Sequence, residues 1–486
     1  MQRTSTPRVA IIGAGFAGLG MAIRLRQRGW PVTVFERAAD VGGVWRDNTY
    51  PGAACDVPSH LYSYSFAPEP RWSRRFGTQP EILAYLQRCA REHGVLEHVR
   101  FGTGIAAADF DESTGTWTLT TEEGAEFTAD AVVSACGQLR VPAFPDLPGR
   151  GRFAGASFHT ARWDHSVDLA GKRVGVVGTG ATAVQVVPAI VYEVGELALF
   201  QRTPPYLIPR SDEPYSARTK RLFERFPLLQ RLNRLRLFLK HEARVIGFGY
   251  FPKVLRAYEA MFRRRLRKQV PDPATRSALD PDHRMGCKRI LLSSDYYPAI
   301  NRPNLKLVTD PAAEVLPEGV RTADGTTHEL DVLIWATGFR SHDFLAPMRV
   351  TGRGGRNLDA QWRAGAEAHL GISVSGFPNF FLLYGPNTNL GHNSIIYMIE
   401  QQLRYVLDAL DRLHRDGLRY LDVRPEVQRG FSDHVQRRTE ASIFGSGCDS
   451  WYLTADGKNT NNWPSSVLTY RKMTRALDPE EYERVR

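Results

Sequence analysis

The chain has 486 residues, of which 42% are hydrophobic and 24% charged, with a formal net charge of +11. This composition is ordinary for a globular protein and excludes a fibrous or largely disordered chain. At about 100–200 residues per domain, the length predicts two to four domains. No stretch reaches the roughly 18 uninterrupted apolar residues that a membrane span requires. The first strand begins by Val9, so we expect no secretory signal peptide before it.

The cysteines are odd in number and scattered, and none belongs to a CxxC pair. They are Cys55, Cys89, Cys136, Cys287 and Cys448. This pattern argues against a disulfide scaffold, a zinc site and a dithiol redox centre. We therefore expect a reducing, cytoplasmic compartment and no metal site.

The N-terminal segment has the pattern of a dinucleotide-binding βαβ unit. An apolar run at 8–12 precedes a Gly-x-Gly-x-x-Gly loop, a helix-periodic stretch at 19–27 and a second strand at 32–35. In such a loop one glycine makes the tight turn, the next lets the backbone approach a pyrophosphate, and the third lets the helix pack on the strand. The three glycines are Gly13, Gly15 and Gly18. Glu36 follows the second strand, where an acid accepts hydrogen bonds from a ribose 2′-hydroxyl.

A second unit of the same kind covers 173–200. Its loop positions are Gly178, Gly180 and, in place of the third glycine, Ala183, a substitution that this packing position accepts. Arg202, rather than an acid, follows the next strand. Because an arginine there suits a 2′-phosphate, the second site is predicted to prefer NADP over NAD. The alternative is a surface arginine without a ligand.

The two units predict an α/β protein with two Rossmann-like, three-layer domains. FAD, whose adenosine ribose has a free 2′-hydroxyl, is assigned to the first domain and NADPH to the second. A buried strand that ends in glycine at 331–338 is interpreted as the chain returning to the first domain. The predicted domains are FAD-binding (1–145 and 341–486), NADP-binding and inserted in it (153–210 and 285–340), and a basic helical insertion (211–284).

The positive charge is concentrated in that helical insertion. Between Arg218 and Lys268 there are 16 Lys or Arg residues and 3 acids, and the rest of the chain is close to neutral. Apolar residues recur there at helical spacing, namely Phe226, Leu229, Leu232, Leu235 and Leu239. We interpret the segment first as a solvated basic face, with contact to an anionic membrane surface as the weaker alternative. Nucleic acid is least favoured, since no recognised nucleic-acid-binding fold carries these cations.

Two longer motifs resemble a known family. The run Phe153-Ala-Gly155-Ala-Ser-Phe-His159-Thr-Ala-Arg-Trp163-Asp164 matches FxGxxxHxxxW(P/D), the fingerprint of type I Baeyer–Villiger monooxygenases. The run from Gly42 to Asp56 matches the longer signature of that family. With the two glycine-rich loops these motifs span the first 200 residues, and a weaker likeness continues through 288–289 and 450–452.

The resemblance implies an FAD enzyme that uses NADPH and O2 to convert a ketone into an ester or lactone, through a peroxide on C4a of the flavin. In such a site a cation that keeps its proton stabilises the peroxide anion, and a carboxylate offsets the desolvation of the cation. Arg289 and Asp56 match these two positions and are the predicted catalytic residues. His159, in the segment between the domains, is expected to be structural.

The same resemblance assigns cofactor contacts. Around the 2′-phosphate of NADP they are Arg202, Thr203 and Lys288. Elsewhere on NADP they are Ala181, Thr182, Gln185 and Trp451, the last in a mobile C-terminal loop. Around the flavin they are Gly43, Val44, Trp45, Asp56, Tyr62, Ile105 and Ile395. For Trp451 and for the aromatic residues near the flavin, simple packing is the alternative interpretation.

Other functions stay open at this point. The same cofactors could serve to hydroxylate a long chain or to oxidise a sulfide or amine, although Arg289 beside Asp56 favours the anionic peroxide that attacks ketones. A pyridine-nucleotide disulfide oxidoreductase would need a reactive cysteine pair, and a non-catalytic flavin- or lipid-binding protein would not need Arg289. The polar stretch 385–394 is expected beside the flavin and resembles the branch with long-chain ketone monooxygenases. We expect a lipophilic small-molecule substrate with O2, and no nucleic acid.

Overall fold

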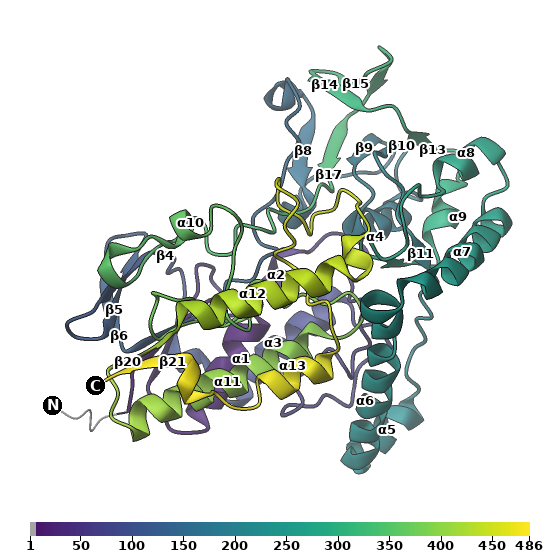
Figure 1. The fold of residues 1–486 in the computed structure, drawn as a ribbon. Helices are drawn as coiled ribbons and strands as arrows, with labels where there is room; N and C mark the ends of the chain where they lie inside the picture. Colours follow the sequence, from purple (N-terminus) through teal and green to yellow (C-terminus); the bar gives the residue numbers. More distant parts are fainter. Residues whose placement is uncertain (1–5) are drawn as a thin grey trace.

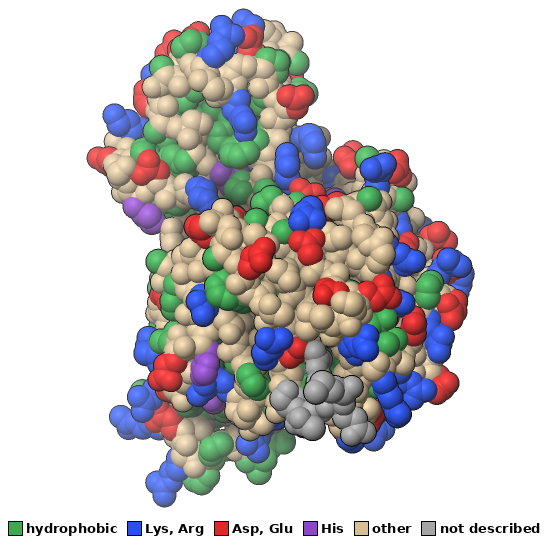
Figure 2. Space-filling view, turned by 90° about the vertical axis from the view of Figure 1, so that its left-hand side faces the viewer, with side chains coloured by type: hydrophobic (Ala, Val, Ile, Leu, Met, Phe, Trp, Pro, Cys, Tyr) green, Lys and Arg blue, Asp and Glu red, His purple; other side chains and the backbone are tan. Residues whose placement is uncertain are grey.

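The computed structural model describes residues 6–486. Its elements form two lobes joined by two chain crossings (Figure 1), and the space-filling view shows a smaller upper lobe above a larger lower one, with a notch between them (Figure 2). Each lobe contains a five-stranded parallel sheet. The predicted α/β class with two Rossmann-like sheets is confirmed.

The sheet of the lower lobe has the strand order β19-β7-β1-β2-β3. Its strands are β1 (Val9–Ile12), β2 (Val32–Phe35), β3 (Val99–Arg100), β7 (Ala131–Ser134) and β19 (Phe380–Leu382). These short apolar runs form a sheet that is covered on both faces, as parallel sheets require. One face, which carries Val9 and Ile11, packs against helices. These are α1 (Phe16–Arg26), α3 (Gln79–Glu92) and α11 (Ile395–Arg415).

The opposite face carries Ala10 and Ile12, because successive side chains of a strand point to opposite sides. It packs against a four-stranded sheet of β4 (Ile105–Asp111), β5 (Thr116–Thr121), β6 (Glu126–Ala129) and β18 (Arg349–Thr351). The lobe also contains α2 (Val44–Asp47), α10 (Leu358–Gln361), α12 (Pro425–Glu440), α13 (Val467–Met473) and the antiparallel pair β20 (Tyr420–Val423) and β21 (Tyr482–Val485).

The upper lobe repeats this three-layer arrangement with the strand order β13-β10-β9-β17-β8. Its strands are β8 (Ala156–His159), β9 (Arg173–Val177), β10 (Glu196–Phe200), β13 (Leu305–Val308) and β17 (Val332–Trp335). Helices α4 (Ala181–Ile190) and α9 (Tyr296–Ile300) pack on the face that carries Val174 and Val176. The other face packs on β14 (Ala312–Leu316), β15 (Gly319–Thr322) and β16 (Thr327–Glu329).

All five strands of the upper sheet lie in the chain between β7 and β19 of the lower sheet. The two crossings run side by side, because the N–H of Ala143 donates to the carbonyl of Gly338 at 2.9 Å and the N–H of Arg340 donates to that of Val141 at 2.9 Å. Paired crossings restrict how freely one lobe can turn against the other.

His159 lies at the end of β8, next to these crossings. Its ring contacts Phe144 of one crossing and Phe339 of the other, with centroid distances of 5.4 and 5.8 Å. Burial lowers the pKa of His159 to about 4, and its Nδ1 accepts a hydrogen bond from the N–H of Ala161 at 3.1 Å. A neutral imidazole that packs between the crossings has the structural role expected from the sequence.

The basic insertion is helical. It comprises α5 (Ala217–Arg225), α6 (Pro227–Glu242), a π-helical turn (Ile246–Tyr250), α7 (Leu255–Gln269) and α8 (Pro273–Ala278), and its base is framed by the paired strands β11 (Leu207–Ile208) and β12 (Leu291–Leu292). Helices α5 and α6 project at the lower right of the molecule (Figure 1). Within residues 6–486, no helix has the length and apolarity needed to cross a bilayer.

The apolar residues predicted at helical spacing in this insertion do not pack into the protein. Phe226, Leu229, Leu232, Leu235 and Leu239 are all exposed. A different face of α6, with Leu237 and Phe238, is buried against the lower lobe. The insertion therefore carries an outward apolar row as well as its cations.

Candidate active site

A large cavity lies where the loops that follow β1 and β9 border the same space. Its volume is about 2040 Å³, which exceeds the roughly 300–1,000 Å³ typical of a site for one small ligand. Segments 42–57, 135–147 and 384–396 and part of the helical insertion complete its wall. All the predicted catalytic and cofactor-binding residues line this cavity except Gly18 and Ala183.

Gly18 and Ala183 lie outside the wall because both serve the packing of a helix on its strand. A Cβ on Gly18 would lie 1.8 Å from the carbonyl oxygen of Gly13, so only glycine fits there. Ala183 is fully buried at the matching place in α4. These two positions shape the loops by packing and lie outside the cavity wall.

The first loop is built to receive an anion. Gly13 adopts a φ of +101°, and a Cβ on Gly43 would lie 3.1 Å from the Cα of Gly15, so the two backbones approach closely. Helix α1 begins after Gly15 without a side-chain cap. Its first N–H groups are therefore left for a ligand, as in other phosphate-binding helix starts.

Glu36 lies at the end of β2 and is only 6% exposed. Its carboxylate accepts hydrogen bonds from the N–H of Ala14 at 2.8 Å, the N–H of Ala38 at 2.9 Å and Nη1 of Arg46 at 3.1 Å. Because a carboxylate offers about four acceptor positions, Glu36 braces the glycine loop and keeps capacity for a hydroxyl in the cavity.

Side chains around this loop form the rest of the cavity wall in the lower lobe. Trp45 Nε1 donates to the hydroxyl of Tyr62 at 3.2 Å, which fixes two of the predicted aromatic residues against each other. The other predicted members are apolar and lie at element ends, namely Val44 at the start of α2, Ile105 at the start of β4 and Ile395 at the start of α11.

The second loop has the same backbone but different side-chain contacts. Gly178 has a φ of +112°, and a Cβ on Gly180 would meet nothing within 4 Å, so this loop opens toward the cavity. Gln185 bonds to the other lobe: its Oε1 accepts from the hydroxyl of Tyr50 and its Nε2 donates to the carbonyl of Ala54, both at 2.9 Å. The side chain expected to contact NADP thus also ties α4 to the flavin-side segment.

Arg202 and Lys288 bring positive charge to this second loop. Within residues 6–486 neither side chain makes an ion pair, and both line the cavity next to Thr203. Burial lowers the pKa of Lys288, and the charge of Arg202 lowers it further, against an opposing effect of Asp449. Two neighbouring cations that repel each other at a cavity wall favour an anionic ligand.

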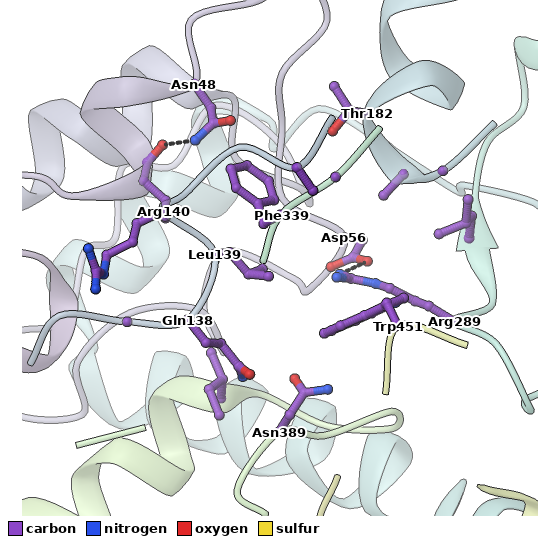
Figure 3. Close-up of a pocket in the computed structure, with 18 of the residues that line it drawn as sticks. Asn48, Asp56, Gln138, Leu139, Arg140, Thr182, Arg289, Phe339, Asn389 and Trp451 are labelled. Atoms are coloured by element: carbon purple, nitrogen blue, oxygen red, sulfur yellow. Dashed lines mark hydrogen bonds and ion pairs between the residues drawn. The ribbon is translucent and has the colours of Figure 1, made fainter. Parts of the chain in front are cut away.

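Arg289 and Asp56 form an ion pair in the cavity wall (Figure 3), with Nη2 and Oδ2 2.5 Å apart. Burial alone would raise the pKa of Asp56, but the charge and hydrogen bond of Arg289 outweigh it and lower that pKa below its ordinary value. The charge of Asp56 in turn raises the pKa of Arg289. The exposed part of the guanidinium faces the cavity, and Figure 3 shows the ring of Trp451 beside it.

Known proteins resemble this chain in sequence and in fold. The family described as flavin-binding monooxygenase-like matches residues 6–237. A Baeyer–Villiger monooxygenase of Pseudomonas aeruginosa is 45% identical, over 98% of this chain and 91% of that protein. This chain belongs to the Baeyer–Villiger monooxygenase family. The resemblance predicted from the two motifs is confirmed.

Two solved structures extend the family match to the fold. An oxidised steroid monooxygenase bound to NADP has a TM-score of 0.89 and 33% identity, covering 99% of this chain and 100% of that one. An OTEMO complex with FAD and NADP has a TM-score of 0.88 and 30% identity, covering 97% of this chain and 98% of that one. The likeness therefore includes both lobes and the helical insertion.

Several residues of this Baeyer–Villiger family site are absent from the sequence prediction. Tyr384 donates its hydroxyl to Oδ1 of Asn389 at 2.9 Å, and Gln138 and Asn389 point into the same open space in Figure 3. Tyr452 is buried in the wall near Arg289. The polar run 385–394 and the weaker likeness at 450–452 were the sequence signals for this part of the wall, and residues 389–393 do line the cavity.

The scattered cysteines argued against a disulfide scaffold, and the structure contains one disulfide within the described residues, which the sequence did not predict. Cys287 and Cys448 form a disulfide, with their Cα atoms 6.2 Å apart. They are 161 positions apart in the sequence, and only the folding of the C-terminal loop onto the segment before Arg289 brings them together. Cysteine usage therefore no longer argues for a reducing compartment, and the cytoplasmic location stays a prediction.

Proposed function

We propose that this chain is an FAD- and NADPH-dependent monooxygenase that inserts oxygen next to the carbonyl of a lipophilic ketone. A ketone, O2, NADPH and one proton give an ester or lactone, water and NADP⁺. The proposal depends above all on the Arg289–Asp56 pair, which lies in the wall of a cavity that both dinucleotide loops share. A fixed cation there can stabilise the negative charge that develops during oxygen transfer.

The residues of the first loop fit FAD. We assign the pyrophosphate to the start of α1 beyond Gly15, and the ribose hydroxyls to the free acceptor capacity of Glu36. Trp45 and Tyr62 then border the ring. Bound FAD supplies two-electron exchange with NADPH and the activation of O2. The likeness to a structure in complex with FAD and NADP supports this assignment.

The second loop fits NADPH rather than NADH. Arg202 and Lys288 provide two cations that form no ion pair within the described residues, and a 2′-phosphate would give each a charge-assisted hydrogen bond. Thr182 lies at the start of α4, where the N–H groups favour the pyrophosphate. Trp451 lies beside Arg289 (Figure 3), and we assign it to a contact with the nicotinamide of bound NADPH.

Arg289 and Asp56 have different electrostatic roles at the reacting centre. The guanidinium cannot release its proton at working pH, so it stabilises negative charge without acting as an acid. Asp56 offsets the cost of bringing that cation out of bulk water and aims its Nη2 group. Apolar residues of the wall, including Phe248, Leu255 and Leu390, favour a lipophilic ketone.

The test measures flavin reduction and ester formation separately. In Arg289→Ala, NADPH should reduce the bound flavin at close to the wild-type rate, while ester formation falls about 100- to 1,000-fold, as for the loss of one oxyanion-stabilising donor. Arg321→Ala, which removes an arginine from the distant β15, is the matched control and should retain ester formation.

Isotopically labelled O2 and a panel of cyclic, aryl and long-chain ketones identify the product. Label in the ring or ester oxygen of a lactone or ester supports the proposal. Wild-type ester formation by Arg289→Ala would contradict the role of Arg289. Oxidation of sulfides or amines with no ester from any ketone would instead favour heteroatom oxygenation.

A further inference from the structure

The exposed apolar side chains of this protein are concentrated in one segment. Of the seventeen large apolar side chains that are exposed within residues 6–486, thirteen lie between Leu222 and Met261. Exposed apolar side chains that are scattered singly need no explanation, but a concentrated group indicates an interaction surface. The segment is the helical insertion.

On α6 these side chains form one row. Leu228, Leu232, Leu235 and Leu239 recur at the spacing of a single helix face and are 65%, 52%, 51% and 53% exposed. The helix is already attached to the lower lobe on its other side, where Gln230 donates to the carbonyl of Glu69 and Arg234 to that of His60. The leucine row is thus a second apolar face, turned away from the protein.

Cations border this row. At about 100° per residue, Arg231 and Arg236 fall on opposite sides of the leucine row, and both are exposed. The three acids of the segment do not neutralise the bordering cations. Glu224 pairs with Arg71, Glu242 accepts from Asn393 and the N–H of Val467, and Glu259 accepts from Arg284.

The helical insertion also places exposed apolar residues at the rim of the active-site cavity. Ile246, Val254 and Tyr258 are each exposed by about half and also line the cavity. We call the leucine row, its bordering arginines and these three rim residues the insertion face. One insertion therefore supplies both an outward apolar surface and part of the wall around the substrate.

We propose that the insertion face docks on a membrane surface that contains anionic lipid. A helix with leucines on one side and arginines at its edges matches the interfacial geometry in which apolar side chains enter the bilayer and cations contact anionic headgroups. A second copy of this chain is a poorer occupant, because like-charged surfaces would meet. Nucleic acid would use the cations but not the leucines. Docking would place the cavity rim at the bilayer, where a lipophilic substrate is concentrated.

The test uses the purified holoenzyme and flotation with phosphatidylcholine vesicles, with or without about one-third phosphatidylglycerol. The wild-type protein should float with the anionic vesicles, and added salt should weaken this binding.

The pair Leu232→Glu/Leu235→Glu and the pair Arg231→Ser/Arg236→Ser should each lower the partition coefficient for the anionic vesicles at least about tenfold. Tyr192→Glu and the pair Arg429→Ser/Arg475→Ser change exposed residues elsewhere and should bind like the wild type.

The variants are expected to keep their flavin content and their rate with a water-soluble ketone, so vesicle binding is scored independently of the proposed reaction. Absence of wild-type flotation, or flotation unchanged in both insertion-face variants, overturns the proposal. So does a wild-type dimer in solution that the leucine variant converts to monomer, which would assign the face to a second copy. Tight binding of duplex DNA that depends on the arginines and not on the leucines would assign it to nucleic acid.

Discussion

The two glycine-rich loops have nearly the same backbone, but the side chains beside them carry opposite charges. In the first, Glu36 is already held by three donors and braces the loop before any ligand arrives. In the second, Arg202 and Lys288 face the cavity without an ion-pair partner in the described residues. From this difference we predict that the glycines form the backbone of each site, whereas the residues beyond the next strand determine which nucleotide is bound.

The third loop position provides the strongest test of this comparison. Gly18→Ala places in the first loop the residue type that Ala183 contributes to the second. The new Cβ would lie 1.8 Å from the backbone oxygen of Gly13, so we expect a loss of about 3 kcal/mol or more in unfolding free energy and release of flavin. Thermal unfolding and flavin content measure both effects.

The reciprocal change serves as control. Ala183→Gly only removes a methyl group from α4 and should cost about 1–2 kcal/mol without loss of flavin. If Gly18→Ala retained flavin and unfolded like the wild type, the first loop would be less tightly packed than the structure indicates.

Removal of the positive charge of Arg202 at the second loop is expected to have the next largest effect, on the KM for NADPH. Arg202→Ala should raise the KM for NADPH about 10- to 100-fold and leave that for NADH nearly unchanged, because only the 2′-phosphate loses its partner. Steady-state rates with both nucleotides provide the measurement. Equal increases for both would mean that Arg202 serves the loop rather than the phosphate.

The smallest expected effect concerns the pH dependence of the ion pair between the loops. Since the folded protein lowers the pKa of Asp56 below 3.8, the Arg289–Asp56 pair stabilises the fold above about pH 4 and loses this contribution as the pH falls through the folded pKa. Asp56→Asn should therefore be less stable than the wild type by about 1 kcal/mol at pH 6. Urea unfolding should show the difference shrinking below pH 4, and a constant difference would argue against the pair.

Some elements depend only on residues that are close together in the sequence, and these elements could be predicted from local sequence patterns. Gly13 and Gly178 follow short apolar strands and precede helices, so each strand–loop–helix unit could be expected. The positions of Arg289 and Asp56 came from the motifs, and the structure places them in contact. Periodicity also predicted helices in the insertion, but periodicity does not say whether an apolar row such as that of Leu232 faces inward or outward.

The features of the site that were not predicted depend on contacts between segments that are far apart in the sequence. Tyr384 and Gln138 reach the cavity because β19 and β7 are neighbours in the sheet, and the sequence marked only the polar run 385–394 that follows Tyr384, not either of these residues. Gln185 was predicted as a nucleotide contact, and its bonds to Tyr50 and Ala54 of the other lobe could not be anticipated without the fold.

The Cys287–Cys448 disulfide has a consequence for movement at the centre of the enzyme. It attaches the loop that carries Trp451 to the segment that carries Arg289, one residue beyond Lys288. While the bond is intact, the tryptophan and the guanidinium share one anchor and cannot be displaced independently by a large distance. Cleavage of the bond by a thiol would remove this shared anchor and free the loop of Trp451 from the segment of Arg289.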